Sequence, residues 1–176
     1  ARFFWEVDQK KTLAQHAEGL KRITFHEKLG TVADKVERVA KLARWLVESD
    51  VVTPAPAGVT KDELAQMAED AAEGLPDAVA DAIRDHYKPV GQGDEVPTAP
   101  VTVAVSLADK LDSIFGFFSI GLQPTGSKDP FALRRAAIGV ISLIVSNNLR
   151  LNLRPFAEKH LSQELVKFMR DRLDAA

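Results

Sequence analysis

The residues best suited to chemistry lie between Ala108 and Val140, where acidic and basic side chains interrupt two apolar runs. Asp109 and Asp112 are three positions apart, so on a helix both carboxylates lie on one face. Two neighbouring carboxylates can bind a metal ion or take part in acid–base chemistry. They can also form ion pairs with the nearby basic residues Lys110, Arg134 and Arg135. We predict the latter, a structural network of ion pairs.

Arg134 and Arg135 are adjacent, so they lie about 100° apart around a helix. An unpaired guanidinium in a protein core costs several kcal/mol. The two side chains therefore cannot both be buried without partners. We expect one of them to pair with Asp109 or Asp112 and the other to point outward.

Four histidines are the other candidates for chemistry, and none has the spacing that places two metal ligands on one helical face. They are His16, His26, His86 and His160. We expect His26 to be a packing residue. The alternative is that it binds a metal ion together with a distant aspartate. The sequence also shows no Ser/His/Asp or Cys/His grouping that favours nucleophilic catalysis.

The loop from Gly121 to Lys128 has a superficial likeness to a phosphate-binding P-loop. It fails because Ser127 separates the second glycine from the lysine, and because the segment follows a helix rather than a strand. Asp129 and Pro130 predict a helix start beside Lys128. Free N–H groups at a helix start can bind phosphate. We predict instead that Asp129 caps this start.

The composition describes an ordinary globular protein of 176 residues with a net charge of −2 and no cysteine. This charge argues against a general nucleic-acid-binding surface, so any RNA contact needs a local basic patch. Thiolate–zinc sites and disulfides are excluded because there is no cysteine. No run of about twenty apolar residues predicts a membrane span.

The periodicity of the apolar residues predicts helices throughout and no pair of strands, so the expected fold class is all-α. A capping box of Thr60 and Glu63 marks one helix start, and Gly30 marks a helix end. Val101, Val103 and Val105 alternate, which leaves a strand as the alternative at the start of the central helix. The expected helices cover 12–29, 31–47, 60–72, 76–87, 101–120, 131–146 and a last one from Pro155.

Four segments together resemble the β subunit of the bacterial two-subunit glycyl-tRNA synthetases. They are ARFFWEVD at the start, FHEKLGTVADKVERV from Phe25, ADKLDSIFGFFSIG from Ala108 and PTGSKDPFALRRAAIGV from Pro124. The resemblance implies an HD-domain-like helical bundle over residues 1–154. It also implies that residues 155–176 form a helix leading toward an anticodon-binding domain that is absent here.

HD hydrolases require a histidine, a His-Asp dipeptide and a distal aspartate around their metal. His26 matches the first of these and Asp109 or Asp112 the last, but this chain has no His-Asp dipeptide. The resemblance therefore implies a scaffold without a metal. It also implies an additional segment, missing here, between the residues that match Ala72 and Glu73.

The function implied by the resemblance is that of a non-catalytic β-subunit fragment in a cytoplasmic glycine–tRNA ligase. ATP and magnesium would be used on the α subunit of an α2β2 assembly. This fragment would contact tRNA(Gly) or serve as a scaffold, with no cofactor and no membrane of its own. The candidate tRNA-binding residues are Lys128, Arg134, Arg135, Arg150 and Arg154. The alternatives are a metal-dependent phosphohydrolase using His26 with Asp109 or Asp112, and a purely structural connector between domains.

Overall fold

The computed structural model describes residues 13–53, 58–73, 80–91, 93–152 and 163–173. In this part of the chain the elements are helices joined by loops, with one two-stranded sheet, and the predicted all-α class is confirmed. The HD-like arrangement and the division at residue 154 stay predictions. The helices are α2 (Leu13–Leu20), α3 (Val32–Glu48), α4 (Lys61–Glu73), α5 (Ala80–Asp85), α6 (Pro100–Ser119), α7 (Leu133–Ser146) and α9 (Gln163–Leu173).

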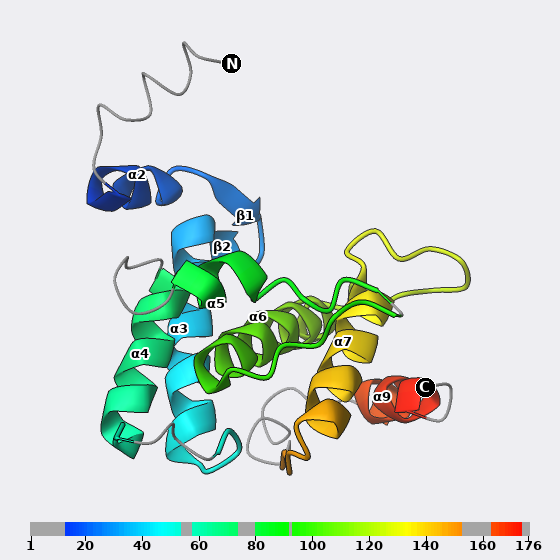
Figure 1. Cartoon of the computed structure of the whole chain (residues 1–176). Coiled ribbons are helices and arrows are strands. Elements are labelled where there is room, and N and C mark those ends of the chain that lie inside the picture. Colours follow the sequence, from blue (N-terminus) through cyan, green and yellow to red (C-terminus); the bar gives the residue numbers. More distant parts are fainter. Residues whose placement is uncertain (1–12, 54–57, 74–79, 92, 153–162, 174–176) are drawn as a thin grey trace.

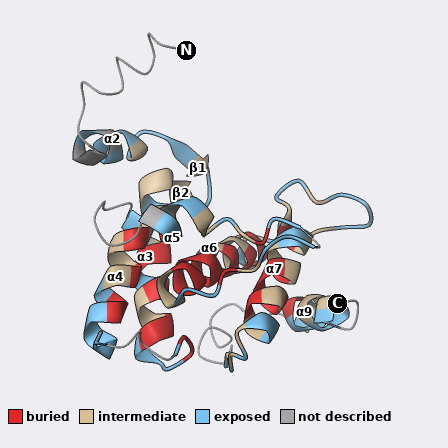
Figure 2. Cartoon of the chain, in the orientation of Figure 1, coloured by how far each residue is buried: buried red, intermediate tan, exposed pale blue. Residues whose placement is uncertain are grey.

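Helix α6 lies at the centre of the described structure (Figure 1). Helices α3 and α4 contact each other and both contact α6. Helix α7 contacts α6 from another direction, and α9 packs against α7. Figure 2 shows the buried residues concentrated along α6 and on parts of α3, α4 and α7. Among the described helices, none combines the length and the apolar character that crossing a bilayer requires.

Helix α6 is central because it is apolar around most of its circumference, which is the pattern of a buried helix. Its side chains at Val103, Leu107, Leu111 and Ile114 are almost fully buried. Pro100 occupies the first turn, where its missing N–H leaves no helical hydrogen bond unmade. The strand alternative at Val101 to Val105 is therefore wrong, because these residues form the first turns of this helix.

Helices α3 and α4 begin with capping boxes. The Thr31 hydroxyl accepts from the Asp34 N–H at 3.2 Å, and the Asp34 carboxylate accepts from the Thr31 N–H at 2.7 Å. Thr60 and Glu63 make the same pair of bonds, as the sequence predicted. These N–H groups favour the charged carboxylates and hold the pKa values of Asp34 and Glu63 below their usual range.

A small antiparallel hairpin, β1 (Thr24–His26) with β2 (Gly30–Thr31), replaces the second half of the predicted helix over 12–29. The prediction that no strands pair was wrong. Gly30 has a φ of +88°, and a Cβ there would collide with the Asp34 carboxylate that caps α3. Gly30 therefore permits both the hairpin and the cap of the next helix.

Helix α7 begins at Leu133, two residues later than predicted, because Ala132 has a φ of +55°. Helix α5 ends at Asp85 rather than Tyr87, and Pro76 lies outside the described residues. The last helix, α9, is described from Gln163, so the predicted start at Pro155 lies outside the described residues as well.

Candidate functional site

Two acids on α6 and two bases on α3 form an ion-pair cluster. Arg38 Nε donates to Asp112 Oδ1 at 2.7 Å, and Arg38 Nη2 donates to Asp112 Oδ2 at 3.2 Å. Lys35 pairs with Asp109, and its ammonium also lies 3.9 Å from an Asp112 oxygen. Arg38 additionally donates to the Leu29 carbonyl at 3.1 Å. We call Lys35, Arg38, Asp109 and Asp112 the α3–α6 cluster.

The α3–α6 cluster corrects the predicted partners of the two acids. Asp109 and Asp112 pair with cations of α3, and the predicted pairing with Arg134 or Arg135 of α7 is wrong. Asp112 is only 8% exposed, and the bidentate contact from Arg38 satisfies both oxygens of its carboxylate. The cluster therefore joins two helices and leaves these carboxylates poorly placed to serve as acid–base catalysts.

Lys110 has a different role from the ion pairing predicted for it. It is 6% exposed, and its ammonium donates to the carbonyls of His86, Tyr87 and Lys88 at 3.1 to 3.3 Å. It also donates to the Ser106 hydroxyl at 2.9 Å. The described residues offer it no carboxylate within ion-pair distance. Lys110 thus ties the segment after α5 to the middle of α6.

Burial of Lys110 lowers the pKa of its ammonium to about 8, because a charged group is less favourable away from water. The carboxylates of Asp109 and Asp94 oppose this shift, and the charge of Lys35 adds to it. A close approach of α7 explains the burial. A Cβ on Gly139 of α7 would lie 2.7 Å from the Lys110 Cε atom.

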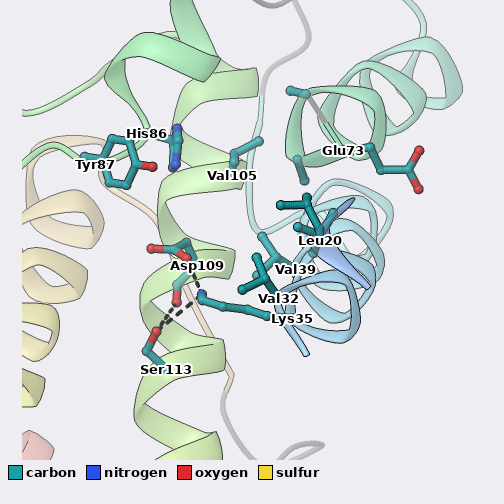
Figure 3. Close-up of a pocket in the computed structure, with 13 residues that line it drawn as sticks. Leu20, Val32, Lys35, Val39, Glu73, His86, Tyr87, Val105, Asp109 and Ser113 are labelled. Carbon is teal, nitrogen blue, oxygen red and sulfur yellow. Dashed lines mark hydrogen bonds and ion pairs between the residues drawn. The ribbon is translucent and has the colours of Figure 1, made fainter. Parts of the chain in front are cut away.

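A pocket of about 470 Å³ opens beside the α3–α6 cluster (Figure 3). Its polar wall contains Lys35, Asp109 and Ser113, and valines of α3 and α6 form much of the rest. Figure 3 shows the rings of His86 and Tyr87 next to each other at one side. Glu73, at the end of α4, lines the same pocket. Since the lysine and the aspartate already pair with each other, this wall is largely neutralised.

The candidate tRNA-binding residues Lys128, Arg134 and Arg135 lie together at the N-terminal end of α7. Lys128 is exposed on the loop 121–132, and Arg135 is exposed on the first turn of the helix. The Arg134 guanidinium donates to the Gly126 carbonyl at 2.6 Å and to the Lys128 carbonyl at 3.5 Å. Arg134 therefore holds the loop that carries Lys128. We call these three cations the α7 basic surface.

Arg150 does not join this surface. Arg150 is exposed, but it follows the far end of α7. The helix rises about 17 Å between Arg135 and its last residue, Ser146, and Arg150 follows that end. Arg154 lies outside the described residues.

The start of α7 is capped by its own chain. The Asp129 carboxylate accepts from the Leu133 N–H at 2.8 Å and from the Arg134 N–H at 2.9 Å. Asp129 thus caps α7, although from a position four residues ahead of Leu133 rather than as the residue next to the helix. A phosphate that bound these N–H groups would have to displace the Asp129 carboxylate. Phosphate contacts at the start of α7 would therefore come from side chains.

His26 packs among aromatic rings. Its ring lies 5.6 Å from that of Phe117 and 6.0 Å from that of Phe131, and its Nδ1 accepts from the Lys28 N–H at 3.2 Å. Nowhere in the described residues do three His, Asp or Glu side chains gather as metal ligands. With Asp109 and Asp112 bound to cations, the residues here do not fit the metal site of an HD hydrolase.

A family model described as the glycyl-tRNA synthetase beta subunit matches residues 1–176. The chain belongs to this family. The glycine–tRNA ligase beta subunit of Cereibacter sphaeroides is 45% identical over 98% of this chain and 30% of its own length. Those of Rhodospirillum centenum and Janthinobacterium are 40% and 39% identical, over 100% and 98% of this chain and 29% of their own lengths. The chain thus spans about 30% of the length of the curated relatives it matches.

These beta subunits contain residues that this chain lacks within the matched region. The comparison with the Rhodospirillum centenum protein extends over 213 residues, about 37 more than the 176 present here. An additional segment in the family was expected on sequence grounds. Its place at Ala72 and Glu73 stays a prediction, and in this chain α4 is continuous through both residues.

The sequence prediction did not identify Lys35, Arg38, Tyr87 and Phe131, which the structure places at the clusters and pockets. A signal for the first two existed. Lys35 and Arg38 have the same three-residue spacing as Asp109 and Asp112, and matched spacings of opposite charge indicate two helices that can pair face to face. Tyr87 follows α5 and Phe131 precedes α7. Nothing in the spacing of these two aromatic residues marks them as members of one site.

Proposed function

We propose that this chain is a non-catalytic part of the β subunit of a cytoplasmic glycine–tRNA ligase, where it contacts tRNA(Gly) or acts as a scaffold. The observation that carries the proposal is the family match over residues 1–176. The complete enzyme would join glycine to tRNA at the expense of ATP. ATP and magnesium would bind the α subunit of an α2β2 assembly, and this region would need no cofactor.

The scaffold role rests on how the polar groups of the core are used. Asp109 and Asp112 bind cations of α3, and the Lys110 ammonium binds three backbone carbonyls. Groups engaged in this way fix the helices relative to one another. They are poorly placed to exchange protons with a substrate.

The tRNA contact rests on the α7 basic surface. Lys128 and Arg135 are exposed, and Arg134 holds the loop between them. Because the net charge of the chain is −2, a local group of cations is what can attract a phosphate backbone. Phosphate contacts of this kind supply affinity and position rather than base recognition. Arg150, which follows the far end of α7, would extend the contact there. Arg154 stays a candidate that lies outside the described residues.

The purely structural connector is the less favoured role. It would be supported by burial of the basic side chains from Arg134 onward. Arg135 and Arg150 are instead exposed, so their charges face solvent in this chain.

Titration of the protein with tRNA(Gly) at increasing salt tests the proposal. We expect affinity to fall steeply with salt, because binding to phosphates releases condensed counterions. In Lys128→Ala/Arg135→Ala the slope of log affinity against log salt should be smaller by about two. The variant Arg22→Ala/Lys167→Ala, which removes two exposed cations elsewhere, is the matched control and should bind as the wild type does. Binding that is undetectable at low salt, or equal in both double variants, would contradict tRNA contact at this surface.

A further inference from the structure

A second, smaller pocket of about 280 Å³ lies between the segment after α5, the middle of α6 and the start of α7. Tyr87 and Val90 line it from the first segment, Lys110 from α6, and Phe131 and Arg135 from the start of α7. It adjoins the α7 basic surface, because Arg135 belongs to both. We call it the Tyr87–Phe131 pocket.

Two aromatic rings of this pocket are exposed and yet held in place. Tyr87 is 65% exposed, and its ring lies 3.9 Å from that of His86 with an angle of 37° between the planes (Figure 3). Phe131 is 36% exposed and stacks on Phe117 at 3.9 Å and 13°. A ring supported by a second ring loses little conformational freedom when a ligand stacks on it. Exposed aromatic groups gathered at a pocket typically mark a binding site.

The charges around the pocket favour an anion. Arg135 contributes an exposed cation, the buried Lys110 ammonium adds positive charge although backbone carbonyls hold it, and Asp109 is the one carboxylate among the described lining residues. Asp109 is paired with Lys35, so the lining keeps an excess of positive charge. Cations in a concave site raise the local concentration of anionic ligands. Rings together with cations match the chemistry of a nucleotide, which has a flat base and a negative phosphate.

We propose that the Tyr87–Phe131 pocket binds one unpaired nucleotide of RNA, with its base stacked on Tyr87 or Phe131 and its phosphate at Arg135. This inference rests on the proposed tRNA contact and specifies what that contact recognises. Bases within an RNA duplex are stacked on their neighbours and cannot enter a pocket. Bases in loops and at ends can stack on aromatic side chains.

The test uses a short single-stranded RNA that carries 2-aminopurine, whose fluorescence falls when the base stacks. We expect the wild-type protein to quench the fluorescence and to bind this RNA more tightly than the same sequence in a duplex. Tyr87→Leu/Phe131→Leu should abolish the quenching and weaken binding about tenfold or more, since stacking on aromatic side chains supplies much of such affinity. Tyr87→Phe should keep both, because it keeps the ring.

Two further variants separate recognition from folding. Val145→Ala/Val166→Ala removes apolar groups that are exposed elsewhere, and it should bind and quench as the wild type does. Arg135→Glu changes an exposed residue and should weaken binding while the thermal unfolding curve stays unchanged. If the leucine variant unfolds at the wild-type temperature and still quenches, the pocket is not the site.

The outcomes distinguish this inference from the function on which it rests. If tRNA binds with the expected salt dependence but the leucine variant binds single-stranded RNA normally, the pocket inference fails alone. If tRNA does not bind but the pocket quenches 2-aminopurine, the tRNA contact fails and the nucleotide site stands. Preference for the duplex over the single strand would overturn the inference in either case.

Discussion

Replacing Asp112 by alanine is expected to lower the free energy of unfolding by about 2–3 kcal/mol, less than the ~3–5 kcal/mol for a fully buried ion pair, because the Arg38 side chain is 38% exposed and can be hydrated. Asp112 is buried and accepts two bonds from Arg38, while Lys35 lies nearby. Without Asp112, Arg38 and Lys35 of α3 would face α6 with too few hydrogen-bond acceptors. Urea unfolding followed by circular dichroism measures the effect.

Matched variants show whether the cost comes from burial. Glu37→Ala removes an acid of α3 that pairs with Lys41 on the exposed side, and the unfolding midpoint should hardly move. Asp112→Ala/Arg38→Met should be less destabilised than the sum of the two single variants, because each single change leaves a charge without its partner. A midpoint for Asp112→Ala equal to that for Glu37→Ala would contradict the role of the α3–α6 cluster.

Replacing Lys110 by methionine is expected to cost about 2–4 kcal/mol of stability near neutral pH, because partly buried backbone carbonyls lose their donor. Methionine keeps much of the volume between α6 and Gly139, so the cost reflects hydrogen bonding more than packing. The carbonyls of His86 and Tyr87 would lose the Lys110 ammonium, whereas that of Lys88 keeps the Ser106 hydroxyl. Relief of the charge burial offsets part of the loss. Urea unfolding of both proteins provides the comparison.

The pH dependence of the same pair of proteins gives an independent test. The pKa of Lys110 is about 8 in the folded chain and 10.5 in the unfolded chain. Between these values the unfolded chain binds the proton more strongly, so stability due to this group rises with pH, by at most about 3 kcal/mol. Below pH 8 both states are protonated, and the folded state bears the full cost of the buried charge.

Lys110→Met lacks this rise, so the stability gap between the two proteins should widen from about pH 7 to about pH 10. A gap that stays constant over this window would show that the ammonium is not held in the buried position described. A methionine variant as stable as the wild type at neutral pH would show that the carbonyls find water instead.

Much of the helical fold follows from local features of the sequence. The capping box of Thr60 and Glu63 and the apolar run of α6 identify two helices directly, because both signals act within a few turns of the chain. The hairpin at Thr24 to Thr31 was missed because its strands are very short. Its turn depends on Gly30 and on the cap of the following helix, a combination that hydrophobic periodicity does not report.

The partners of the charged residues were harder to predict. The sequence shows that Asp109 and Asp112 share a face, but not which helix meets that face. Proximity in sequence favoured Arg134 and Arg135, whereas packing brought α3 against α6 from more than 70 positions away. The same holds for Tyr87 and Phe131, which are far apart in the chain and meet at one pocket only in the folded structure.

Hydrogen–deuterium exchange of the protein with and without tRNA(Gly) tests most directly whether RNA binds at the start of α7. We predict slower exchange in the loop 121–132 and in residues 86–91 when tRNA is present, with little change in α4. Protection confined to α4 and the outer face of α3, or no protection at all under conditions where tRNA binds, would contradict the α7 basic surface as the contact.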